Sequence, residues 1–201
     1  MHPELAPGPV LVWRLPSPLL TISSGALGGG IGERRWVINA TVPHGYDRDD
    51  PDVHLAELAA ALDLTGPGTG FLTAVDVREV ATAADSGVLA HVTAGIGAHP
   101  TWAAAPDAAV AAPSVGTINA VCFLPVRLSD AALVNAVATV AEAKAQALAE
   151  AGVPGTGTST DATALLCPVD GEPEAYGGPR SRVGSALARA AHTAIHTALR
   201  A

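Results

Sequence analysis

Gly-Thr-Ile-Asn-Ala-Val-Cys-Phe-Leu, at residues 116–124, is the stretch that most constrains the fold of this chain. Its β-branched and aromatic residues predict a buried strand. Ser129 and Asp130 follow as helix-start residues, and apolar side chains then recur near a helical period to about residue 151. Another apolar run, at residues 162–169, predicts a second strand. The order strand, helix, strand indicates a sheet with a helix packed on it.

The remaining elements extend this sheet. Apolar runs bounded by turn residues predict strands at 10–14, 18–24, 36–42, 70–77 and 88–96, the first two separated by a turn at Pro16-Ser17-Pro18. Helical periods predict helices at 52–62 and 182–199, and residues 97–115 predict a loop. We therefore expect an α/β protein of the mixed α+β kind. It would be a single domain over residues 1–201, with a mixed sheet of about seven strands and three main helices packed on it.

Composition narrows the classes of partner. The formal net charge is -8, which argues against nucleic acid as a partner because its binding depends on clustered Lys and Arg. Cys122 and Cys167 lie in apolar runs and are interpreted as small buried side chains, since two cysteines make neither a disulfide framework nor a zinc site. No signal peptide or membrane-spanning run is visible, so we expect a soluble cytoplasmic protein with no membrane partner.

Gly155-Thr156-Gly157-Thr158-Ser159-Thr160-Asp161 combines glycines, hydroxyls and one carboxylate just before the strand at 162–169. Glycines let the backbone approach a ligand closely, and a carboxylate can accept a proton or a hydrogen bond. A plain linker could also be small and polar, but it would not need an acid at its end. The segment predicts a site loop at the end of a strand.

Two further segments have a functional and a structural interpretation. The glycine loop at 25–32 is not a dinucleotide fingerprint, because charged residues and then a strand follow it; it is either a simple turn or a place of close approach to a ligand. His44 follows a strand end, where it is either a general base or a loop histidine without a role.

Polar residues on the predicted helices and strands are equally open. His192 and His196 share a helix face, but without a third ligand we expect no metal. Glu142 and Lys144 lie two positions apart on a helix and do not pair, so they are either solvated or one of them points into a cleft. Thr117 and Asn119 lie on one face of a strand, where they could hold an amide or an oxyanion, or could cap a neighbouring loop.

Taken in order along the chain, these motifs resemble the adenosylcobinamide amidohydrolase family over about residues 10–199. The most specific of them are Gly116-Thr117-Ile118-Asn119, Glu142-Ala143-Lys144 and the loop from Thr156 to Asp161. The supporting motifs are Ile22-Ser23-Ser24, Leu27-Gly28-Gly29-Gly30, Asn39 with Val42-Pro43-His44-Gly45-Tyr46, Thr73-Ala74, Val92-Thr93-Ala94-Gly95 and Leu128-Ser129-Asp130.

The resemblance implies a salvage enzyme of the cobalamin pathway. Such an enzyme hydrolyses the amide between the corrin propionyl side chain and aminopropanol of adenosylcobinamide, giving adenosylcobyric acid and 1-amino-2-propanol. The corrinoid is then a small-molecule substrate, and no cofactor and no metal are expected. The oligomeric state stays open, with a homodimer as one option.

The resemblance also suggests roles for individual residues. The candidates for catalysis, as bases or hydroxyl nucleophiles, are Asp161, Glu142, His44, Thr117 and Thr160. The candidates for substrate binding and oxyanion stabilisation are Ser24, Gly29, Gly30, Asn39, Thr93, Asn119, Lys144, Gly157 and Thr158. A threonine nucleophile and an activated water both remain open.

The chain departs from the family pattern at three polar positions. Ala98, Arg180 and Ser185 stand where the family usually has Asn, His and Glu. These departures keep a second hypothesis open, a corrinoid-binding protein of the same fold with lost or altered amidase activity. A third hypothesis is a hydrolase of an unrelated amide.

Overall fold

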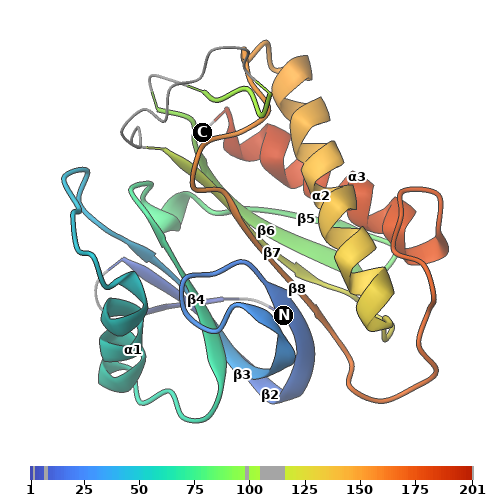
Figure 1. The fold of residues 1–201 in the computed structure, drawn as a ribbon, viewed down its shortest axis with the longest axis horizontal. Coiled ribbons are helices and arrows are strands. Elements are labelled where there is room, and N and C mark those ends of the chain that lie inside the picture. The colour runs from blue at the N-terminus through green and yellow to red at the C-terminus, as the bar shows by residue number, and fades with distance from the viewer. Residues whose placement is uncertain (2, 7–8, 98–99, 105–115, 201) are drawn as a thin grey trace.

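The computed structural model describes residues 1, 3–6, 9–97, 100–104 and 116–200 as one α/β unit (Figure 1). Within these residues the strands are β1 (Glu4–Ala6), β2 (Val10–Ser23), β3 (Gly30–Thr41), β4 (Gly68–Thr73), β5 (Ala81–Asp85), β6 (Val88–Gly95), β7 (Thr117–Phe123) and β8 (Ala162–Cys167). The α-helices are α1 (Pro51–Ala61), α2 (Asp130–Glu150) and α3 (Arg182–Ala198), and a short 3-10 helix covers Val77–Glu79. The predicted fold class is confirmed.

All eight strands belong to one mixed sheet. Its order is β4-β3-β2-β8-β7-β6-β5, with β1 paired to β2 at the side. The pairs β3–β4 and β7–β8 are parallel, and the other pairs are antiparallel. The β7–α2–β8 unit is the predicted strand, helix and strand, and it forms the centre of the sheet.

The helices cover different parts of the sheet (Figure 1). Helices α2 and α3 pack on β5 to β8 through a cluster of small and aliphatic residues that includes Leu133, Leu165 and Leu187. Helix α1 packs on β2, β3 and β4 through Leu55 and Ala59. Burial of this apolar surface is the main favourable contribution to the stability of the fold.

A third cluster shows that the sheet is strongly bent. Trp13 of β2, Val37 of β3 and Phe71 of β4 pack with Val121 of β7 and Leu166 of β8. Strands β3 and β4 are not neighbours of β7 in the sheet order, so the two halves of the sheet must face each other across this cluster. The polar site described below lies at one end of the same interior.

Three predictions about the strands were wrong in detail. The turn expected at Pro16-Ser17-Pro18 is absent, because β2 runs continuously through it, and its register against β3 shifts between Arg14 and Leu19. Proline cannot donate to a ladder, and such an irregularity accommodates it without ending the strand. The strands expected at 70–77 and 162–169 end earlier, at Thr73 and Cys167.

Strand β5 was not predicted, because its sequence Ala-Thr-Ala-Ala-Asp is poor in β-branched and aromatic residues. It pairs with β6 through a tight turn at Ser86 and Gly87, which have φ of 46° and 86°. Positive φ at both central residues is the geometry of a two-residue hairpin. The Ser-Gly pair was therefore the local signal for this strand.

Candidate active site

Four buried polar side chains meet in the interior of the bent sheet. Asn39 of β3 donates from Nδ2 to Thr93 Oγ1 of β6 at 3.0 Å. Asn119 of β7 donates from Nδ2 to Asn39 Oδ1 at 3.0 Å, and Thr117 Oγ1 donates to Asn119 Oδ1 at 3.3 Å. All four residues are at most 4% exposed. Polar groups buried this deeply must be hydrogen-bonded, so the cluster holds the two halves of the sheet in one relative position.

Asn119 has a second contact that explains why an amide is needed here. Its Nδ2 also donates to the backbone oxygen of Leu72 in β4, at 3.1 Å. Strand β4 lies at an edge of the sheet, where backbone groups lack a partner strand. A side-chain amide provides two N–H donors and one acceptor, and Asn119 uses all three. Asn39 and Asn119, predicted to bind substrate, are thus also structural links.

A cavity of about 380 Å³ lies beside this cluster. Five of the predicted site residues line it, and they come from different segments of the chain: Ser24, His44, Thr117, Asn119 and Thr160. The rest of the lining consists of Ala26, Val42, Pro43, Tyr46, Pro51, Phe71, Leu72, Thr73, Ala74, Gly116 and Ala162. Asn39 and Thr93 lie behind the wall that Asn119 forms.

His44 and Tyr46 form the side of the cavity that follows β3. They lie in a tight turn that closes when Tyr46 N donates to Pro43 O at 3.0 Å. Tyr46 Oη lies 3.1 Å from His54 Nδ1 of α1, and the two rings stack with centroids 5.5 Å apart. Partial burial raises the pKa of the Tyr46 hydroxyl. We did not predict Tyr46 as a site residue, although its place two residues after His44 was the available signal.

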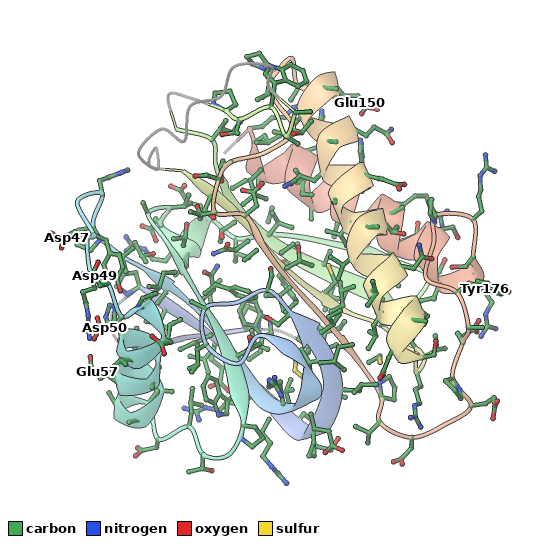
Figure 2. The ribbon with its side chains drawn as sticks, viewed as in Figure 1. Asp47, Asp49, Asp50, Glu57, Glu150 and Tyr176 are labelled. Carbon is green, nitrogen blue, oxygen red and sulfur yellow. The ribbon has the colours of Figure 1, made fainter. Side chains whose placement is uncertain are left out.

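The same segment carries a group of charges (Figure 2). Asp47, Asp49 and Asp50 follow the cavity turn, and Glu57 lies on α1 beside them. Arg48 donates to the carboxylates of Asp50 and Glu57, at 2.8 Å and 2.9 Å, and so lowers the pKa of both. This side of the molecule next to the cavity therefore stays negatively charged.

The loop at 155–161 reaches the cavity through Thr160 alone. Thr160 O accepts from Thr117 Oγ1 at 2.9 Å, and Thr160 Oγ1 donates to Gly116 O at 2.9 Å. Asp161, the next residue, instead lines a separate cavity of about 180 Å³ together with Lys144 and the residues of α2. There the Asp161 carboxylate pairs with Lys144 Nζ, and the two side chains are 12% and 19% exposed.

Comparison with known proteins is consistent with this geometry. The family model for adenosylcobinamide amidohydrolase matches residues 2–201. The chain belongs to the adenosylcobinamide amidohydrolase family. It is 30% identical over 166 residues to the adenosylcobinamide amidohydrolase of Methanosarcina mazei, an alignment covering 83% of this chain and 76% of the relative. It is 33% identical over 189 residues to the protein of that name from Halobacterium salinarum, covering 89% of this chain and 79% of the relative.

The structure of this adenosylcobinamide amidohydrolase family member leaves some predicted site residues away from the cavity. Glu142 lines a different cavity, between α2, α3 and β5, with Asp85 and His192. Because Lys144 is two positions further on, it faces another side of α2, as the helical period requires. Gly29 and Gly30 are exposed in the segment that leads into β3, and φ of Gly30 is +85°.

Two of the three departures from the family pattern, Arg180 and Ser185, are not among the residues that line the cavity. Arg180 lines a hollow with Tyr176 and Asn135, near the start of α2, and Ser185 Oγ donates to Arg182 O at 3.2 Å within α3. Replacement of the usual His and Glu at Arg180 and Ser185 therefore leaves the cavity walls unchanged. Ala98 lies outside the described residues.

The remaining candidates fall into structural roles. His192 and His196 stack with ring centroids 5.9 Å apart, and His192 Nε2 lies 2.8 Å from Glu150 Oε2. Across the described parts of the chain, no group of three or more His, Cys, Asp or Glu side chains could hold a metal ion.

Cys122 and Cys167 are buried and free, as predicted. None of the described helices is long and apolar enough to span a membrane.

Proposed function

We propose that this chain hydrolyses the amide between the corrin propionyl side chain and aminopropanol of adenosylcobinamide. The products are adenosylcobyric acid and 1-amino-2-propanol. The observation that carries this proposal is the match of the family model to nearly the whole chain, at residues 2–201. A cavity that carries several polar side chains, next to a buried hydrogen-bonded cluster, supports it, because amide hydrolysis needs a proton acceptor and donors for the oxyanion.

His44 is our candidate for the general base. Among the residues that line the cavity it is the one with an imidazole, a group that can take a proton from one atom and return it to another. In the proposed step a water oxygen bonds to the amide carbon while His44 takes its proton. The carbon–nitrogen bond then breaks, and the leaving amine takes a proton back from the imidazolium.

Hydrogen bonding within the site favours water over a threonine nucleophile. The single Thr117 hydroxyl proton is shared between Thr160 O, at 2.9 Å, and Asn119 Oδ1, at 3.3 Å, and the Thr160 hydroxyl donates to Gly116 O. Both hydroxyl protons are therefore committed to protein acceptors. Ser24 Oγ accepts from Thr163 N at 3.0 Å, so its own proton can be donated to the substrate.

The size of the cavity suggests which part of the substrate enters. About 380 Å³ lies at the small end of the range of about 300–1,000 Å³ for ligand pockets. It suits the amide-bearing arm, while the much larger corrin ring would lie at the mouth. The proposal thus describes a carbon–nitrogen hydrolase for a linear amide, acting in the cytoplasm without a cofactor, with the corrinoid as its small-molecule partner.

Product release is the direct test. The purified protein is incubated with adenosylcobinamide, and 1-amino-2-propanol and adenosylcobyric acid are quantified by mass spectrometry. We expect equimolar release by the wild type, a large loss in His44→Gln and an unchanged rate in His196→Gln, a histidine on α3 away from the cavity. Binding without release would favour a corrinoid-binding protein with lost activity, and neither binding nor release would exclude both readings.

A further inference from the structure

The Asp161 carboxylate is surrounded by hydrogen-bond donors from three segments. Oδ1 accepts from Ile118 N at 2.9 Å and from Thr158 Oγ1 at 2.5 Å. Oδ2 accepts from Thr158 N at 3.0 Å and from Lys144 Nζ. The side chain is 12% exposed. The acceptor positions of this carboxylate are thus occupied by protein donors, one of them a cation, rather than open to a water molecule.

The carboxylate also lies on the wrong side of the sheet for contact with substrate. It lines the cavity of about 180 Å³ under α2, with Ile118, Ala120 and Lys144. Thr117 and Asn119, the neighbours of Ile118 in β7, line the candidate active site. Side chains alternate between the two faces of a strand, so the backbone of β7 runs between Asp161 and the site, and Ser24 is the residue common to the linings of both cavities.

The bond to Ile118 N explains what Asp161 does for the site. Strand β8 begins to pair with β7 at Asn119 and Ala162, so Ile118 lies just beyond the paired region. The carboxylate takes the place of a partner strand there, and it ties the turn at 158–161 to the start of β7. This places Thr160 where its carbonyl accepts from Thr117 and its hydroxyl donates to Gly116 O.

The rest of the loop is built around this ion pair. A Cβ on Gly157 would overlap the Asp161 carboxylate and lie 2.6 Å from Lys144 Nζ, so a side chain at this position would displace the ion pair. On its other side the loop is held by Thr101, whose N donates to Gly157 O at 2.8 Å. Lys144, in the C-terminal half of α2, fixes the loop to this helix through its ion pair with Asp161.

We infer that Asp161 and Lys144 are a positioning pair, which holds Thr160 and Thr117 in the cavity wall, and that neither is the catalytic base. This inference rests on the proposed function for its activity readout. It replaces the catalytic role that we had predicted for Asp161 and the substrate-binding role for Lys144. It also gives the Glu-Ala-Lys and Thr-Gly-Thr motifs one shared structural purpose.

The test compares three variants with a matched control. Asp161→Asn, Lys144→Met and Thr158→Ala each weaken the pair or its donors. Asp85→Asn removes an ion pair to Arg189, 2.7 Å long, at a distant place on β5. We expect kcat/KM to fall by about ten- to a hundredfold in the first three, since small misplacements cost such factors. The low-pH limb of the rate profile should stay where it is in the wild type, and Asp85→Asn should keep full activity.

Non-additivity gives a second readout. Because the two side chains act as one unit, the double variant Asp161→Asn with Lys144→Met should be no slower than the worse single variant. The inference is overturned if the rate profile of Asp161→Asn no longer has the low-pH limb. It is also overturned if kcat/KM of Asp161→Asn falls a thousandfold or more while Lys144→Met and Thr158→Ala are as fast as the wild type. Should Asp161→Asn not fold, full activity of Thr158→Ala and Lys144→Met would overturn it.

Failure of the proposed function can be told apart from failure of this inference. If the wild type releases no aminopropanol, the proposed function is wrong, and amide hydrogen exchange then tests the pair alone. Exchange at Ile118 N should be faster in Asp161→Asn than in the wild type and unchanged in Asp85→Asn. Equal exchange rates at Ile118 N in Asp161→Asn and the wild type would contradict the positioning role inferred for Asp161 and Lys144.

Discussion

Replacing Asn119 by Ala should destabilise the protein more than its position at a cavity wall suggests. The substitution removes both donors of the amide, so Asn39 Oδ1 and Leu72 O lose a hydrogen bond. A buried acceptor left without its donor costs about 1–3 kcal/mol. Water in the adjoining cavity can reach part of this space, which favours the lower half of that range. We expect the free energy of unfolding to fall by about 2–4 kcal/mol for the two groups together.

The assay is urea unfolding followed by tryptophan fluorescence. Asn119→Asp is a useful companion, because it keeps the shape of the side chain and replaces the donors by a carboxylate that faces two acceptors. It should be at least as destabilising as Asn119→Ala, which separates loss of hydrogen bonds from loss of volume. As a control, Asn135→Ala on the exposed side of α2 should change stability by no more than about 0.5 kcal/mol.

The account of the bent sheet would be refuted by a small effect. If Asn119→Ala lowered the free energy of unfolding by less than about 1 kcal/mol, the bonds from β7 to β3 and β4 would not hold the two halves together. An unchanged midpoint in Asn119→Asp would contradict the geometry more strongly, since it would require that the new carboxylate find other donors.

Two further predictions concern titration. A histidine base works only when its imidazole is neutral, so kcat/KM of the wild type should fall as the pH is lowered. The His44→Gln variant should be slow, and its kcat/KM should show no such fall at low pH. If the fall at low pH is retained in His44→Gln, His44 is not the base. Burial raises the pKa of the Cys122 thiol to about 12 from the ordinary 9.0. The unfolded chain therefore ionises first, so the free energy of unfolding should be unaffected by this thiol below pH 9 and fall by about 1.4 kcal/mol per unit from there to about pH 12. Urea unfolding at several alkaline pH values should show a shallower fall in Cys122→Ala, and equal slopes would contradict this.

Local patterns were sufficient to predict the central elements of the fold. The strand at 117–123 is a short run rich in β-branched and apolar residues. The helix at 130–150 has apolar residues near a helical period and a clear start at Ser129, whose hydroxyl accepts from Ala132 N. The alternation in β7 also placed Thr117 and Asn119 on one face correctly. Strand β5 was not predicted because small residues such as Ala81 and Ala83 are not typical of strands.

The site was harder to predict because it depends on contacts between distant segments. Asn39 bonds to a residue 54 positions away, and Asn119 bonds to one 47 positions away, across a bend that no local pattern encodes. Likewise, Thr160 and Asp161 are adjacent in sequence but line different cavities. The sequence made the Asp161 carboxylate a candidate base, whereas the four donors around it support the positioning role inferred above.

If hydrolysis takes place in the cavity of about 380 Å³, then filling that cavity should stop it. Ala26 lines this cavity and is exposed, so Ala26→Trp can place an indole there without disturbing the core. The control is Ala188→Trp, which places an indole in the cavity between α2 and α3. Release of 1-amino-2-propanol from adenosylcobinamide is then measured for both variants, with circular dichroism to confirm the fold. We predict loss of release in Ala26→Trp and a wild-type rate in Ala188→Trp. A folded Ala26→Trp protein that releases aminopropanol at the wild-type rate would contradict the claim.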